Sequence, residues 1–327
     1  MSDQPQPRVQ LTRPFTNIGV DFAGPVILRD SYSRSPKTHK AYIAVYVCMC
    51  TKAVHLELVS NLTSEAFLAS LRRLVSTRGS PVTIKSDNGS NFIGANRELQ
   101  EILKEVKSHP FNKQISNALV ADGISWIFNP PAAPHMGGLW EAAVKSAKFH
   151  IHRVLKNAPL NFEEYAKVLK EIEACLNSRP LCPQSSDPDD LEALTPGHFI
   201  IGGPLKSIPE ADLTTVKVNR LTRWQHQQQM KQQFWRRWHL EYLQHLQKRT
   251  KWKLPQANVK VGDLVVLRED HSPPHYWKLW RIEEVHPNDK DNKKLTRTVT
   301  VRTADGNFKR PITRLVLLPS PSENDSE

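Results

Sequence analysis

The stretch Val82-Thr83-Ile84-Lys85-Ser86-Asp87-Asn88-Gly89-Ser90-Asn91-Phe92 decides the fold class and the candidate site. Its first half predicts a short β-branched strand that ends at Asp87. Asn88-Gly89 is typical of a tight turn, so we expect the chain to reverse there and leave Asp87 exposed at the edge of a sheet. Two further acids belong with it: Asp21 lies in an earlier strand-like run, and Glu141 opens an apparent helix. The sequence therefore predicts a triad of carboxylates.

Three carboxylates in one cleft need a compensating cation. Each pair at ~4 Å repels by about 4 kcal/mol when the effective dielectric is near 20. One or two Mg²⁺ ions are the usual solution for hard oxygen ligands, and they can activate water and stabilise both oxygens of an in-line phosphoryl displacement. Asp-Asn-Gly alone is most often a plain turn, so the assignment depends on the other motifs.

Those motifs resemble the integrases of Bel/Pao long-terminal-repeat retrotransposons, in the retroviral integrase superfamily. The resemblance covers about residues 13 to 320, and the motifs together are far more specific than any one of them. The matching stretches are Ser86–Phe92 with Asp21 before it and Glu141 after it, Pro134–Glu141, Leu176–Leu181, and Leu194–Phe199.

The resemblance implies the chemistry and the setting. Asp21, Asp87 and Glu141 become the catalytic residues and metal ligands, holding two Mg²⁺ (or Mn²⁺) ions per active site. The implied activity is removal of terminal nucleotides from element DNA, followed by strand transfer of the new 3′-hydroxyl into target DNA. The partners are the element ends and target DNA, the enzyme is a homo-oligomer because two ends require two active sites, and the location is the nucleus.

Four residues near the acids are candidate DNA contacts. By resemblance, Ser90 and Asn91 face target DNA, although turn formation alone would explain them. Lys145 and Lys148 lie one and two helical turns beyond Glu141 on the same face, where they could grip phosphates; an ordinary Glu-to-Lys surface pair is the alternative.

A basic segment follows the core. Between Val216 and Val261 there are eleven Lys or Arg against a single acid, Glu241, in a chain of net charge +12. A long helix is predicted there, with an aromatic stripe that indicates either core packing or a contact between subunits. The basic flank favours a polyanion as partner, against the alternative of a solvated face. The stripe is Leu221, Trp224, Trp235, Trp238, Tyr242 and Leu246, and the candidate DNA-binding cations are Arg236, Arg237, Lys248, Arg249, Lys251 and Lys253.

The fold class that follows is α/β: a ribonuclease-H-like mixed-sheet catalytic core, a basic helical linker and a small SH3-like β-barrel. The barrel is a candidate site for a chromatin partner. Expected boundaries are a flexible lead-in at 1–12, the core at 13–200, the linker at 201–258, the barrel at 259–319 and a disordered tail at 320–327.

Alternatives of other classes stay open. The chain could be a domesticated DNA- or chromatin-binding protein without catalysis, or a metal nuclease of the same fold. Integrases usually carry a zinc-binding domain before the core, and only residues 1–12 precede it here, which indicates either a piece of a polyprotein or a truncated copy. The four cysteines form no zinc-finger pattern, and no apolar run approaches the ~20 residues of a membrane helix.

Overall fold

The computed structural model describes residues 12–30, 37–108, 124–128, 138–155, 158, 160–247, 259–269, 271–287, 296–303 and 306–319, without the side chains of 102–108, 138–145 and 147. The chain divides into two compact units, Met1–Leu176 and Asn177–Glu327. This division assigns residues 177–200 to the second unit, whereas the sequence analysis ended the core at 200. The segments expected to be a flexible lead-in and a tail fall almost wholly outside the described residues.

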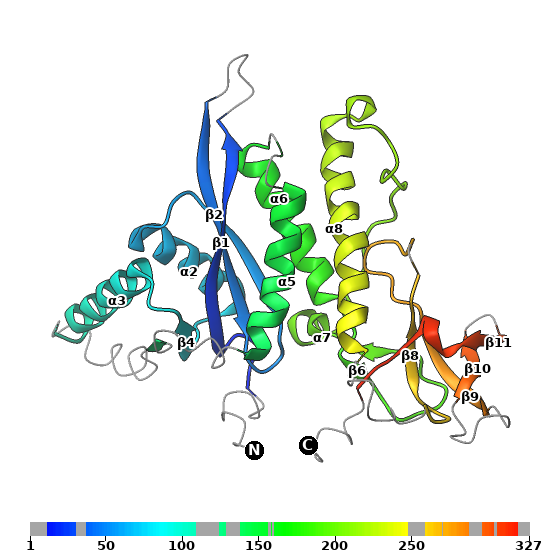
Figure 1. The fold of residues 1–327 in the computed structure, drawn as a ribbon. Coiled ribbons are helices and arrows are strands. Elements are labelled where there is room, and N and C mark those ends of the chain that lie inside the picture. The colour runs from blue at the N-terminus through cyan, green and yellow to red at the C-terminus, as the bar shows by residue number, and fades with distance from the viewer. Residues whose placement is uncertain are drawn as a thin grey trace. The chain divides into compact units, whose positions relative to one another are not determined.

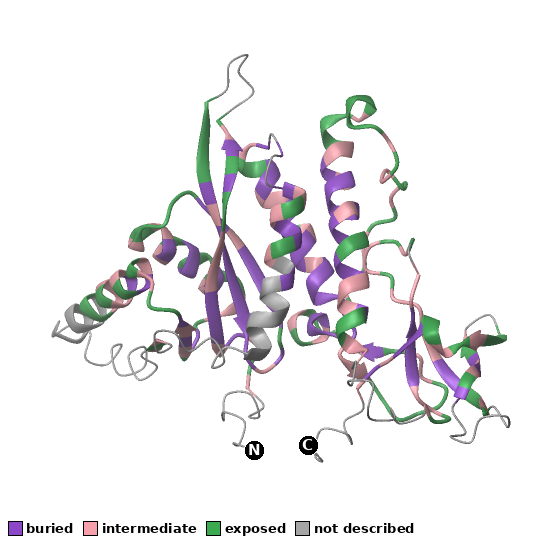
Figure 2. Ribbon diagram, in the orientation of Figure 1, coloured by how far each residue is buried: buried purple, intermediate pink, exposed green. Residues whose placement is uncertain are grey.

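Unit 1 is built on a five-stranded mixed sheet of order β3-β2-β1-β4-β5. The first three strands form the antiparallel meander expected from the sequence, and β1 and β5 each pair in parallel with β4. Buried residues lie near the start of β1, at 18–20, and along the second half of β2, at 43–48 (Figure 2). The strands are β1 (Asn17–Arg29), β2 (Thr38–Cys48), β3 (Val54–Val59), β4 (Thr83–Ser86) and β5 (Ser125–Phe128).

Helices cover both faces of this sheet, with α2 and α3 on one side and α5 and α6 on the other (Figure 1). Phe67 of α2 and Phe92 of α3 meet Phe22 on one face, and Lys148 of α5 reaches Asp21 on the opposite face. Neighbouring residues of a strand point to opposite faces, which explains why Asp21 and Phe22 contact different helices. The helices are α2 (Ser64–Arg78), α3 (Ser90–Ser108), α5 (Gly138–Leu155) and α6 (Phe162–Asn177).

Helix α3 begins at Ser90, directly after the predicted Asn88-Gly89 turn, and the N–H groups of Phe92 and Ile93 donate to the carbonyl of Gly89. Gly94 within this helix is a contact point with α2, because a Cβ there would lie 2.2 Å from Ser64 Oγ. The absence of a side chain at Gly94 therefore lets the two helices pack closely.

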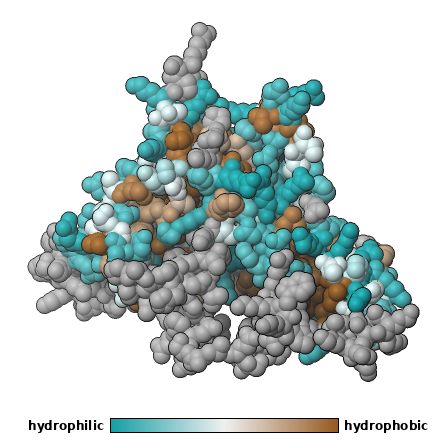
Figure 3. Space-filling model, in the orientation of Figure 1, coloured by the Kyte–Doolittle hydropathy of each residue, from teal (hydrophilic) through white to brown (hydrophobic). Residues whose placement is uncertain are grey.

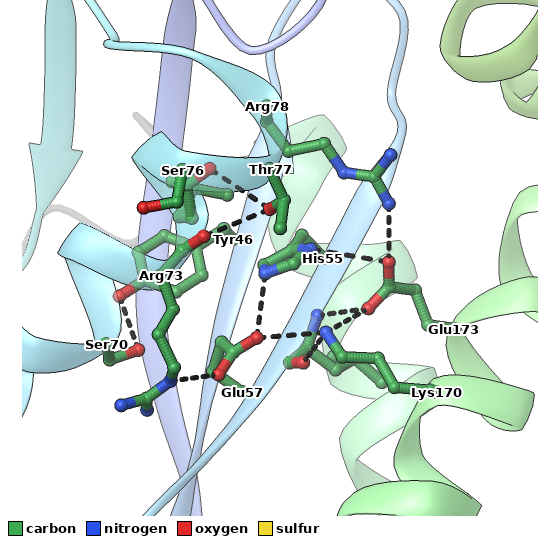
Figure 4. A network of polar contacts seen from close by, with 12 residues as sticks. Tyr46, His55, Glu57, Ser70, Arg73, Ser76, Thr77, Arg78, Lys170 and Glu173 are labelled. Carbon is green, nitrogen blue, oxygen red and sulfur yellow. Dashed lines mark hydrogen bonds and ion pairs between the residues drawn. The ribbon is translucent and has the colours of Figure 1, made fainter.

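A buried polar network ties α2 and α6 to β3, the edge strand of the sheet (Figure 4). Glu173 of α6 accepts a 2.9 Å bond from the N–H of Leu56, and Lys170 donates to the Leu56 carbonyl at 2.7 Å. The ring nitrogens of His55 lie 3.0 Å from Glu57 and 3.3 Å from Glu173. Side chains of α6 thus occupy backbone groups of an edge strand, a position that otherwise invites pairing with another chain.

Unit 2 joins a helix, α8, to a β-rich domain through one core. The second five-stranded sheet has the order β11-β10-β9-β8-β12, and the 3₁₀ turn η4 precedes its last strand, β12, which pairs with β8. This arrangement matches the expected SH3-like barrel and mixed α/β fold class. A second, two-stranded sheet pairs β6 with β7. The elements are β6 (Cys182–Pro183), β7 (Ala193–Leu194), α7 (Pro196–Ile201), η3 (Val218–Arg220), α8 (Arg223–Leu246), β8 (Leu264–Leu267), β9 (Leu279–Pro287), β10 (Thr296–Thr303), β11 (Gly306–Pro311), η4 (Ile312–Arg314) and β12 (Leu315–Leu317).

The aromatic stripe of α8 lies mostly in this core. Trp235 and Trp238 are 1% and 3% exposed, and both rings pack edge-on against Trp277. Trp224, by contrast, is 57% exposed. Of the two alternatives left by the sequence, Trp235 and Trp238 follow core packing, so α8 is part of the fold of unit 2 and more than a linker.

Glutamines on α8 hold an irregular segment, residues 210–216, against the helix. Gln229 donates to the carbonyls of Leu213 and Val216, both at 2.7 Å, and Gln232 bonds Ala211 and Leu213 at 2.8 Å. These amides replace the ladder hydrogen bonds that the segment lacks, as buried backbone groups require.

Hydrophobic residues on the visible described surface form separate patches among hydrophilic ones (Figure 3). Among the described residues, no helix combines the length and apolarity needed to span a bilayer.

The network of Figure 4 predicts an acid-sensitive unit 1. Burial alone would raise the pKa of Glu57 and Glu173, but His55, Lys170 and, for Glu57, Arg73 outweigh it and lower each pKa from 4.5 to about 2. Because the folded pKa is the lower one, the stabilisation is complete above about pH 4.5 and is lost as the pH falls towards 2.

We therefore expect Glu173→Gln to lower the free energy of unfolding at pH 7 and to flatten its decline between pH 4.5 and 2, by up to about 1.4 kcal/mol for each pH unit in that window. Denaturant unfolding at a series of pH values measures this decline. Glu163→Gln, which removes an exposed carboxylate from the same helix, is the control. An equal decline in both variants would contradict a stabilising role for the network.

Candidate active site

Strand pairing brings the first two predicted acids together. In the parallel pair β1 and β4, Asn17, Ile18 and Gly19 face Thr83, Ile84 and Lys85. If this register is continued by two residues, Asp21 falls opposite Asp87, the residue that follows β4. The side chain of Asp21 is 37% exposed and Asp87 is exposed. The register therefore agrees with the predicted pairing of two accessible carboxylates.

The local backbone around Asp87 is tightly constrained. Its carboxylate accepts a 3.1 Å bond from the N–H of Gly89. A Cβ on Gly89 would lie 3.1 Å from that same carboxylate oxygen and 2.7 Å from Asn91 Oδ1. A glycine fits this position because any side chain would crowd the acid.

The third acid, Glu141, is in the first turn of α5, where the sequence placed it, but its side chain lies outside the described residues, as does that of Lys145. Lys148 stands two turns further along, and its ammonium forms an ion pair with Asp21 Oδ2.

The donor set fits a divalent cation. Asp21 and Asp87 offer the hard carboxylate oxygens that Mg²⁺ prefers, and the side chain now against Asp21 is itself a cation. Among the residues whose side chains the structure describes, no group of three or more His, Cys, Asp or Glu is assembled for a metal. The arrangement is therefore a two-carboxylate site, and the predicted third ligand remains an expectation.

The other predicted DNA-binding residues are distributed over both units. Ser90 is exposed and Asn91 half-buried in the first turn of α3, directly after the Asp87 turn. Arg236 and Arg237 are exposed on α8 in unit 2. Arg236 lies close to Asp212, whose pKa is lowered mainly by hydrogen bonds from Thr214 and less by the charges of His271 and Arg236. Lys248, Arg249, Lys251 and Lys253 lie outside the described residues.

Two motifs of the resemblance have structural roles in unit 2. Tyr242 donates to the carbonyl of Pro180 at 2.6 Å, and Trp277 donates to Ser178 at 3.3 Å, so the Asn177–Pro180 stretch is buried under α8 and the barrel. Burial raises the pKa of Tyr242 to about 12, although the nearby Arg179 opposes that rise. Thr195 and His198 form a capping box at the start of α7.

The sequence analysis did not predict the contacts of Ser86, the residue directly before Asp87. Ser86 is fully buried and hydrogen-bonded to Trp126, and Trp126 belongs to an aromatic cluster with Phe67 and Phe92. One sequence signal pointed to these contacts: Ser86 is a small polar residue on the buried face of a short strand, and a buried hydroxyl needs a hydrogen-bond partner.

Lys148 gives a testable consequence. Its ammonium compensates the charge of Asp21, so a metal ion that binds Asp21 must either displace the ammonium or bind beside a like charge. Lys148→Met should therefore tighten Mn²⁺ binding by at least about fivefold, since two unit charges ~4 Å apart interact by about 1 kcal/mol even at the dielectric constant of water. Calorimetric titration with Mn²⁺ measures this. Lys167→Met, which removes an ion-paired lysine from α6, is the control; equal affinities in all three proteins would contradict the proposed competition.

Two family models match separate parts of the chain. Residues 20–132 match the model described as "Integrase core domain", a range that contains Asp21 and Asp87. Residues 222–318 match "Family of unknown function (DUF5641)", a range that runs from the N-cap of α8 to the end of the barrel. The second match therefore coincides with the helix and barrel that share one core.

Among solved structures, the chain is similar to one in the cryoEM structure of the simian T-cell lymphotropic virus intasome in complex with PP2A regulatory subunit B56 gamma. Identity is 14%, the TM-score is 0.36, and the alignment covers 98% of this chain and 85% of that one. Among curated proteins, none matches the sequence. The match over residues 20–132, together with the five-stranded mixed sheet of unit 1, identifies this part of the chain as an integrase core domain.

Proposed function

We propose that the chain is the integrase of a Bel/Pao-type retrotransposon, a polynucleotidyl transferase that processes the 3′-ends of element DNA and joins them to target DNA. The observation that supports this is the β1–β4 register, which, continued by two residues, sets Asp21 opposite Asp87 just past the end of β4. The integrase core match over the same residues supports it.

In this proposal Asp21, Asp87 and Glu141 hold two Mg²⁺ or Mn²⁺ ions. Bound there, the ions supply the positive charge that stabilises the attacking and leaving oxygens of an in-line displacement at phosphorus. The protein's own contribution is placement: β1 carries Asp21, Asp87 follows β4 directly, and α5 carries Glu141 and Lys148.

DNA is held by residues around these acids and by α8. Lys148, and Lys145 one turn before it, contact the element phosphates, while Ser90 and Asn91 lie at the entrance for target DNA. Joining two ends requires at least two active sites, so the working enzyme is a homo-oligomer, and its site of action is the nucleus. The barrel of unit 2 is available for a chromatin partner.

Asp87→Asn tests the catalytic assignment. Removing one metal ligand should abolish strand transfer of labelled terminal-repeat ends into plasmid, while DNA binding persists and thermal stability is unchanged or slightly raised, because carboxylate repulsion falls. Asp30→Asn is the matched control, since Asp30 is an exposed acid of the same unit that pairs with His39.

The same assay separates the alternatives. Joined products in Mg²⁺ or Mn²⁺ support an integrase, nicks without joining indicate a metal nuclease, and binding without cleavage indicates a DNA- or chromatin-binding protein. Undiminished turnover in Asp87→Asn would overturn the assignment of this acid.

Arg236 and Arg237 test the role of α8. If both contact phosphates, replacing them by glutamine should flatten the plot of log K against log salt by roughly 1.8 units, from about 0.9 per contact, without changing sequence preference. Fluorescence anisotropy at a series of salt concentrations measures the slope. Lys167→Gln, which removes an ion-paired cation from α6, should leave it unchanged. A slope that is the same in the double variant would show that this face is only solvated.

A further inference from the structure

Ser86 is the last residue of β4 and the immediate neighbour of Asp87. Its side chain is fully buried, and its hydroxyl makes two contacts: it accepts from the indole N–H of Trp126 on β5 and donates to the carbonyl of Asp87, both at 2.9 Å. One hydroxyl thus connects the neighbouring strand to the main chain of a candidate metal ligand.

A serine in this position is costly unless both of its bonds are made. A buried hydroxyl without partners is unfavourable, and alanine would fill the same space without that cost. Removing the hydroxyl would also leave the Trp126 N–H without the partner described for it. A buried strand position would otherwise take an apolar residue, so a serine here indicates that its two hydrogen bonds serve a purpose.

Trp126 is itself held in orientation by aromatic packing. Its ring lies 5.6 Å from that of Phe67 and 6.3 Å from that of Phe92, and Phe92 stacks on Phe22 at 5.3 Å. Phe22 follows Asp21 directly, and Phe92 lies in the first turn of α3, after the Asp87 turn. We call Phe22, Phe67, Phe92 and Trp126 the aromatic brace. It packs beneath the segments that carry both acids.

The carboxylate of Asp87 has little else to fix it. It is exposed, and the hydrogen bond described for it comes from Gly89, two residues away in the same turn. Its position relative to Asp21 is consequently set by the main chain at residues 86 and 87. Two carboxylates that share a cation must be placed to within roughly 0.5 Å, which makes that main-chain position functionally important.

We propose that Ser86 and Trp126 are positioning residues, which fix the main chain of Asp87 through the shared hydroxyl and thereby set the geometry of the metal site. This inference rests on the proposed function, because it assumes that Asp21 and Asp87 bind a divalent cation. It adds two residues that contact neither metal nor DNA and act through Asp87.

The test compares two buried serines of unit 1. Ser86→Ala removes the hydroxyl beside Asp87, whereas Ser70→Ala removes an equally buried hydroxyl that bonds Tyr46 at 2.8 Å in the network of Figure 4. Mn²⁺ binding is measured on the full chain by the loss of the free-ion electron paramagnetic resonance signal, with DNA binding and thermal midpoints measured in parallel.

We expect Ser86→Ala to weaken Mn²⁺ binding by about fivefold, the equivalent of one net hydrogen bond, without loss of DNA binding. Ser70→Ala should lower the thermal midpoint and leave Mn²⁺ binding unchanged. Ser86→Thr, which keeps the hydroxyl, should restore the affinity. Trp126→Phe, which keeps a ring but loses the N–H, should weaken Mn²⁺ binding as Ser86→Ala does, and it serves as the test if Ser86→Ala fails to fold.

Two results would overturn the proposal. Mn²⁺ affinity in Ser86→Ala equal to that of the unsubstituted chain would remove the positioning role, and an equal loss in Ser86→Ala and Ser70→Ala would assign the effect to stability alone. Failure of the unsubstituted chain to bind Mn²⁺ saturably is a distinct outcome, because it would overturn the proposed function and this inference together.

Discussion

The parallel pairing of β1 with β4 is the constraint on which the site depends. Asp21 and Asp87 are far apart in sequence, and it is the register that sets Asn17 against Thr83 which, continued by two residues, would bring them opposite each other. A shift of one residue would turn one side chain to the opposite face of the sheet, away from its partner. The antiparallel meander fixes β1 from its other edge, and aromatic rings from α2 and α3 pack against Phe22. Much of unit 1 therefore serves to hold one register.

Unit 1 contains two pairs of acids whose charges are compensated to different extents. Glu57 and Glu173 are surrounded by His55, Lys170 and two arginines, and these partners outweigh burial enough to lower both pKa values to about 2. Such carboxylates already have their countercharge and can stabilise a fold. The pair formed by Asp21 and Asp87 has one described cation, Lys148, on a flexible stem. An incompletely compensated and accessible pair of carboxylates is what a divalent ion can complete.

Local patterns in the sequence predicted most elements of unit 1, because alternating burial and helix signals such as Thr63 and Gly79 act over a few residues. They failed where tertiary contacts decide. A stripe of tryptophans has the same sequence pattern whether it packs in a core or against a partner, and only the position of Trp277 assigns Trp235 and Trp238 to the core. The Asp21–Asp87 pair could be proposed from motifs, but Ser86 could not be assigned a partner, since Trp126 comes from another strand. The contacts of Ser178 and Pro180 with Trp277 and Tyr242 also join residues far apart in the sequence, so local patterns did not reveal them.

The packing of α8 in unit 2 bears on the DNA-binding role proposed for it. Its Trp235 and Trp238 are fixed against Trp277, and its glutamines hold residues 210–216, so the helix is immobilised along much of its length. Arg236 and Arg237, between those anchored positions, are exposed. Side chains on a fixed helix lose less conformational freedom on binding than side chains on a mobile linker, and more of the phosphate attraction is then retained as affinity. A basic helix packed into the core of its own unit would thus hold a polyanion better than a basic helix that serves only as a linker.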